Sequence, residues 1–193
     1  VLPASIGEVG SAAFFQCQDL KSVKFTPGSK QVKLGDNLFT GCYYLTSVTL
    51  PTSIDRIGVG MFQNCISLAG VQIPKDAGSI GQSAFSSCSS LTTVIIPDSV
   101  TSIGIAAFAN CPLTDIYFTG SEAQWNSISK IGDTQAAVSN VTKHYDYVPA
   151  PPDSGDGDNN NPGGDNSGGN NSGDHNNPGA TQSAARNQPG VVH

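Results

Sequence analysis

Five cysteines are the residues of this 193-residue chain whose chemistry is most readily judged from spacing. Each follows a phenylalanine by three residues, and successive cysteines lie 25, 23, 23 and 23 residues apart. Zinc sites of the common kind need a C-x-x-C pair or a Cys/His cluster, and neither occurs. Five is also an odd number for a disulfide framework. We therefore expect buried free thiols that bind no metal: Cys17, Cys42, Cys65, Cys88 and Cys111.

The three histidines do not indicate a catalytic site. His144 precedes an Asp/Asn-rich tail, and His175 and His193 lie within that tail. No G-x-S-x-G motif accompanies them, and no phosphate-binding glycine loop is present. We interpret the histidines as solvated side chains, and we predict a protein that is not an enzyme and has no cofactor.

Two short motifs in the C-terminal part are compatible with ion or glycan attachment. Residues 153–161, "DSGDGDNNN", contain the oxygen ligands that calcium prefers, but an EF-hand loop from Asp156 would have Asn161 where Gly is needed. We expect only weak, non-specific cation attraction there. Asn140 and Asn170 begin N-x-S/T sequons and are candidate glycosylation sites, although so short a motif also occurs by chance.

The cysteines belong to a unit that recurs five times between Leu2 and Phe118. Each unit has an apolar residue and glycine, then F-x-x-C, then an alternating apolar pair such as Val94 and Ile96. Units of about 23 residues cannot bury an apolar face alone, whereas stacked units bury one jointly. The pattern predicts a β-rich solenoid of about five stacked units with a parallel strand ladder. The predicted core columns are the cysteines and Phe14, Phe39, Phe62, Phe85 and Phe108.

The residues that alternate with the buried strand positions predict an outward-facing ladder, because successive side chains of a strand point to opposite faces. Such a strand face is the usual binding surface of repeat proteins. We expect Ile95 and Tyr117 to be its exposed apolar residues, and an ordinary solvated sheet face is the alternative. The candidate binding residues are Lys24, Thr49, Gln72, Ile95 and Tyr117.

The pattern I-G-x-x-A-F-x-x-C-x-x-L-x-x-V-x-I-P-x-S-V resembles the 23-residue repeats of the BspA-like leucine-rich repeat family. The resemblance covers about residues 2–117 and is best at 80–103, while the second unit has two extra residues. It implies that the solenoid is a leucine-rich-repeat solenoid with a right-handed coil. It also implies an extracellular or cell-surface protein without an active site. The implied role is adhesion or protein–protein interaction through the strand face, with a protein or glycan ligand. A passive structural spacer or wall-layer element, tethered by the low-complexity tail, is the alternative.

The chain divides into three predicted parts: the solenoid at 1–119, a C-terminal cap at 120–148 and a tail at 149–193. Ser121 and Gln124 have capping-box spacing for a short helix, Trp125 is expected over the last coil, and residues 141–148 alternate like a strand. The tail is rich in Asn, Gly, Asp and Pro and has no aromatic residue. It cannot bury enough surface to offset its ordering entropy, so we predict disorder.

The net charge of −6 is concentrated at the C-terminal end. Residues 1–145 contain nine acidic and eight basic side chains, and six acidic residues with one Arg follow. A nucleic-acid-binding protein needs a basic patch, and none is visible. The sequence contains no run of 18 apolar residues, so no membrane-spanning segment is predicted. The chain starts at Val1 with no visible signal peptide.

Overall fold

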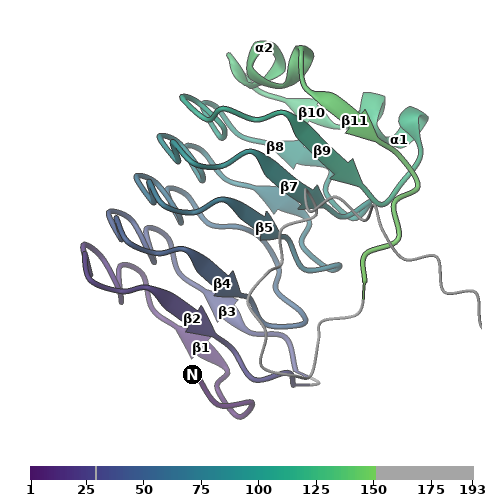
Figure 1. The fold of residues 1–193 in the computed structure, drawn as a ribbon. Helices are drawn as coiled ribbons and strands as arrows, with labels where there is room; N and C mark the ends of the chain where they lie inside the picture. Colours follow the sequence, from purple (N-terminus) through teal and green to yellow (C-terminus); the bar gives the residue numbers. More distant parts are fainter. Residues whose placement is uncertain (29, 151–193) are drawn as a thin grey trace, which may run out of the picture.

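The computed structural model describes residues 1–28 and 30–150, which wind into a solenoid of about five turns (Figure 1). The predicted parallel-strand solenoid is confirmed. The strands form two rows along the solenoid, and all strand pairs are parallel. The coil between β4 and β5 joins the short-strand row only through isolated bridges of Ile54 and Ile57. The long-strand row consists of β2 (Ser22–Lys24), β4 (Ser47–Thr49), β5 (Gly70–Gln72), β7 (Thr93–Ile96), β9 (Asp115–Phe118) and β11 (Thr142–His144). The short-strand row consists of β1 (Glu8–Val9), β3 (Lys33–Leu34), β6 (Ser79–Ile80), β8 (Ser102–Ile103) and β10 (Ser129–Lys130).

Stacked phenylalanines run along the core. The ring centroids of successive members are 5.3 to 5.4 Å apart, and the rings lie nearly parallel. Four of the five rings are buried, while Phe14 in the first coil is partly buried. Each ring therefore contacts the same kind of neighbour above and below, which lets one residue type recur at one place in every coil. The column consists of Phe14, Phe39, Phe62, Phe85 and Phe108.

The turns around the phenylalanines use left-handed backbone conformations at two positions per coil. One position stands two residues after the glycine that follows the apolar residue of each unit, and the other directly precedes the cysteine. Their φ angles lie between 52° and 74°. Glycine tolerates this conformation without cost and asparagine at low cost, and these two residue types occupy five of the ten positions. The positions are Ala12, Asn37, Gly60, Ser83 and Ala106, and Gln16, Gly41, Asn64, Ser87 and Asn110.

The glycine that follows the apolar residue of each unit allows successive coils to touch at this corner. A Cβ atom at Gly81 would lie 2.8 Å from the carbonyl carbon of Gly58, and one at Gly104 would lie 2.6 Å from the amide nitrogen of Gln82. Both neighbours are backbone atoms of the preceding coil. The glycine is therefore required by close backbone approach at this corner.

The long-strand row is interrupted once among the described residues. β2 pairs with β4, and β5 pairs with β7, β9 and β11, but β4 and β5 are not paired. The same two coils remain bonded through their turns, where Asn37 N–H and Phe39 N–H each donate to the next coil at 2.8 Å. The two coils are therefore joined at the phenylalanine side and parted along the strand face.

Residues 120–148 continue both rows rather than only covering the last coil. β10 pairs with β8 and β11 pairs with β9. Helix α1 (Glu122–Ser127) begins with a capping box between Ser121 and Gln124. Helix α2 (Thr134–Ser139) stands near the place where earlier coils have the phenylalanine turn (Figure 1). Trp125 is buried edge-on against Phe118 at 5.5 Å, with Lys130 Nζ 4.6 Å from its ring centroid.

Candidate binding surface on the long-strand row

The outward column consists of Lys24, Thr49, Gln72, Ile95 and Tyr117, and the structure places these residues at successive positions of the long-strand row. Lys24 is beside Thr49, and Gln72, Ile95 and Tyr117 are beside one another in register. Lys24 is exposed, and Thr49, Gln72 and Tyr117 are half-buried. Four of the five candidate residues therefore reach solvent.

Ile95 differs from its expected exposure. It is only 6 % exposed, although it lies outside the main apolar cluster of the core. Gln72 and Tyr117 stand directly beside it in register, and both have longer side chains than Ile. The expectation of an exposed apolar residue at Ile95 is therefore wrong.

His144 extends the outward column by one strand, because β11 aligns it with Tyr117. The two rings are stacked with centroids 4.4 Å apart, and Tyr147 packs against Tyr117 at 4.8 Å with a tilt of 54°. His144 Nε2 lies 2.7 Å from Asp115 Oδ1. The side chain of His144 is 41% exposed, as expected for a solvated residue, but the sequence did not predict these two partners. Sequence reasoning missed the group, because the alternation of residues 141–148 predicts a strand but not its register against β9.

Neighbouring groups shift the pKa values of Asp115 and Tyr117 in this aromatic group. The hydrogen bond with His144 is the main cause that lowers the pKa of Asp115, and a hydrogen bond with Thr114 adds to it. Burial, and then the negative charge of Asp115, raise the pKa of Tyr117. At neutral pH the surface therefore presents a carboxylate acceptor and a phenol donor, the polar groups that protein and glycan ligands both use.

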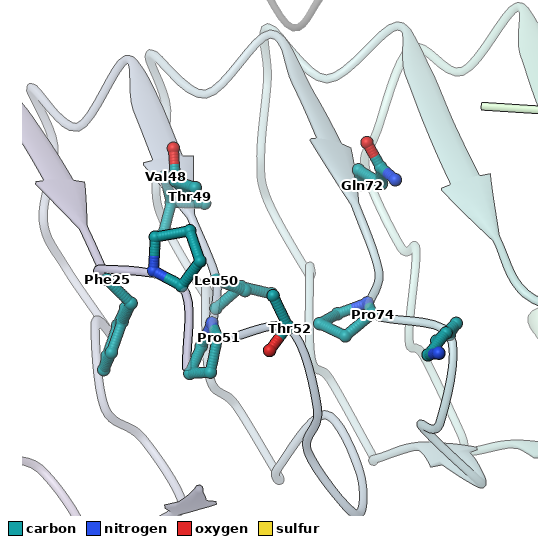
Figure 2. A pocket seen from close by; sticks show the side chains of 10 residues that line it. Phe25, Val48, Thr49, Leu50, Pro51, Thr52, Gln72 and Pro74 are labelled. Carbon is teal, nitrogen blue, oxygen red and sulfur yellow. The ribbon is translucent and has the colours of Figure 1, made fainter. Parts of the chain in front are cut away.

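A groove lies on the same face, where the row is interrupted between β4 and β5. It has a volume of about 300 Å³ and a mostly apolar lining. Figure 2 shows Val48, Thr49 and Leu50 on one side and Gln72 on the other, with Pro51 and Pro74 below the carboxyl ends of the strands. Thr49 and Gln72 are also members of the outward column. Sequence analysis did not predict this groove.

The thiols lie apart from this surface. Cys42, Cys65 and Cys88 are buried, Cys111 is half-buried and Cys17 is exposed. The expectation of a buried thiol is wrong at Cys17 and only partly met at Cys111. Among the described residues, no coil packs on the far side of the first coil, so Cys17 is exposed. Burial raises the pKa of Cys42 to about 11. No group of three or more His, Cys, Asp or Glu within residues 1–28 and 30–150 is placed to hold a metal ion.

The remaining candidates divide between the described residues and the tail. Asn140 is exposed at the end of α2, as a glycan acceptor must be. Asn170, His175, His193 and the acidic run 153–161 lie outside the described residues. Neither helix of the described part has the length and apolar character needed to cross a membrane.

A parallel solenoid with one F-x-x-C unit per coil defines the class as a leucine-rich repeat protein. Residues 7–133 match the model of the BspA type leucine-rich repeat region, with six copies. The chain belongs to this family. No curated protein matches the chain.

Three solved structures are similar to the chain. A leucine-rich cell surface protein from Faecalibacterium prausnitzii is 33% identical over 68% of this chain and 34% of its own, with a TM-score of 0.62. A leucine-rich repeat protein of T. pallidum is 38% identical over 57% and 51% of the two chains, with a TM-score of 0.54. One from Bacteroides ovatus is 27% identical over 75% and 41%, with a TM-score of 0.52. The chain thus spans between a third and about half of these proteins.

Proposed function

We propose that this chain is the non-enzymatic binding module of a cell-surface or secreted protein and that it adheres to a protein or glycan through the long-strand row. The observation that carries the proposal is the combination, on one face, of an apolar groove and an aromatic group around Tyr117. Interfaces concentrate binding energy in a few aromatic residues surrounded by polar ones, and the outward column has this composition.

The cell-surface location is supported by the similarity to the F. prausnitzii protein, which is a cell surface protein. Membership of a leucine-rich repeat family supports protein binding, because solenoids of this kind offer extended surfaces for partners. A passive spacer would have the same coils, but its function would not depend on which residues occupy the strand face.

Substitution of exposed tyrosines separates the two roles. The full chain is tested for binding to a panel of immobilised extracellular proteins and glycans, as wild type, as Tyr117→Ala and as Tyr44→Ala. Tyr44 is 59% exposed and lies outside the strand face, so it is a matched control. We expect Tyr117→Ala to weaken binding by about tenfold or more, as loss of an aromatic anchor does, and Tyr44→Ala to have no effect. Equal binding by both variants, with the fold intact, would favour the spacer.

A further inference from the structure

We propose that the groove between β4 and β5 binds one apolar side chain of an extended, acidic peptide segment of a partner protein, with Lys75 pairing the partner's carboxylate. This inference rests on the proposed function and gives the class of ligand for one part of the same face. It is carried by the interruption of the ladder, the change in burial that accompanies it, and the charge at the rim.

The interruption removes a hydrogen bond that the equivalent coils make. Phe25 N–H donates to Thr49 O at 2.9 Å, and Ile73 N–H donates to Ile95 O at 3.0 Å. Leu50 occupies the corresponding position, yet no backbone hydrogen bond joins it to β5 within the described part of the chain. The coils are therefore separated at the carboxyl ends of β4 and β5, where the groove opens.

The separation exposes one side chain that belongs to the core in other coils. Val71 and Val94 are at most 3% exposed, whereas Val48 at the same position of its coil is half-buried. Val48 and Leu50 line the groove together with Phe25. Pro51 and Pro74 form its lower rim and offer no N–H groups, so the rim is apolar as well.

The dimensions favour a side chain over a strand. Cα atoms of β4 and β5 approach within 8 Å, whereas a strand inserted between them needs about 9.5 Å, twice the usual strand spacing. The volume of about 300 Å³ is at the lower end of ligand pockets, which suits one or two apolar side chains. A glycan fits poorly, since the lining has no exposed aromatic ring on which a sugar could stack.

The charge at the rim indicates an acidic partner. Lys75 is the charged residue of the lining, and no carboxylate lines the groove with it. Lys75 is exposed and forms no ion pair with another described residue. The adjacent Asp76 is exposed but does not line the groove. A carboxylate next to the bound apolar residue would meet an unpaired ammonium group.

The test is an NMR titration of the isotope-labelled full chain with the peptide acetyl-Thr-Val-Leu-Asp-Thr-amide. We expect the amide signals of Val48, Leu50 and Lys75 to shift. Replacing the peptide's leucine by glycine should weaken binding by at least about tenfold, the value of one buried leucine side chain. Replacing its aspartate by asparagine should weaken binding by about fivefold.

Two charge reversals provide a matched comparison in the protein. Lys75→Glu should weaken peptide binding by about fivefold or more, whereas Lys21→Glu, an equal change at an exposed residue outside the groove, should leave it unchanged. Neither side chain is in the core, so both variants are expected to fold.

Three results would overturn the inference: no shifts at the groove, equal binding of the glycine peptide, or a change in the signals of residues 151–193 when the groove is altered by Val48→Lys without any peptide. The last result would make the chain's own tail the occupant. The proposed function is tested separately, by the binding of the Tyr117→Ala variant to immobilised proteins and glycans. A failure of the groove inference can therefore be told from a failure of the proposed function.

Discussion

The Sγ atom of Cys88 lies 3.0 Å from the carbonyl oxygen of Phe62, the phenylalanine of the preceding coil. Cys42, Cys65 and Cys111 make the same contact to the phenylalanine one coil earlier, at 3.0 to 3.2 Å. A thiol is a small, weakly donating group, so it fits a core position where a backbone carbonyl needs a partner. The F-x-x-C spacing therefore bonds each coil to the one before it.

Thiol reactivity should follow position along the solenoid. Cys17 is exposed and should be alkylated by iodoacetamide in the native protein, whereas Cys65 and Cys88 should react only after unfolding. Burial also raises the pKa of Cys42 and Cys65 and so disfavours the reactive thiolate. Mass spectrometry of protein alkylated before and after denaturation measures the order. Native labelling of Cys88 as fast as Cys17 would contradict the buried column.

The phenylalanine column should supply a large share of the stability. Phe85→Ala removes a fully buried ring between two stacked neighbours and should cost about 3–5 kcal/mol. Phe15→Ala is the matched control, because Phe15 is 47% exposed, and it should cost less than about 1 kcal/mol. Denaturant unfolding followed by circular dichroism gives both values, and similar losses for the two variants would disprove the packing described.

The corner glycines should tolerate a methyl group only in the first coil. A Cβ at Gly81 would press on backbone atoms of Gly58 and Val59 at 2.8 Å, so Gly81→Ala should destabilise by about 1–3 kcal/mol. Gly10 occupies the same position of the first coil and has no neighbour within 4 Å. Gly10→Ala should leave the melting temperature unchanged or raise it slightly. A neutral Gly81→Ala would mean that the coils are not in close contact.

The pair of Asp115 and His144 should make stability depend on pH in the acid range. Because the folded-state pKa of Asp115 is lowered below 3.8, its contribution is fully present above that value and is lost as the pH falls through the folded-state pKa. Asp115→Asn should therefore cost at most about 1 kcal/mol near neutral pH, and progressively less in acid. Asp55→Asn, at an exposed residue, is the control. A penalty that is constant with pH would exclude the pair as its cause.

The repeat predicts the fold because every unit has apolar residues at the same positions. The equivalents of Phe85, Cys88 and Val94 recur at a nearly constant spacing, and they can all be buried only if the units stack. The interruption between β4 and β5 leaves no such trace, because Val48 and Val71 are separated by the usual 23 residues. The interruption is visible only in the structure, where the two coils lack the hydrogen bond between their strands.

The burial of a single side chain likewise depends on its position along the solenoid rather than on its residue type. Cys17 has the same sequence context as Cys88 but has no coil before it among the described residues, and it is exposed. The contact of His144 with Asp115 and Tyr117 depends on the register of β11 against β9, which a 29-residue separation does not reveal. The outward column was predictable as a set of residues, whereas its groove and aromatic group were not.

Amide hydrogen exchange at three equivalent positions tests the account most directly. The amides of Phe25, Leu50 and Ile73 each follow a strand of the long-strand row. Phe25 and Ile73 are bonded to the next coil and should exchange slowly, whereas Leu50 lacks that bond and should exchange at least about tenfold faster. Slow exchange at all three would show a continuous ladder without a groove, and fast exchange at all three would show that the coils are not stacked as described.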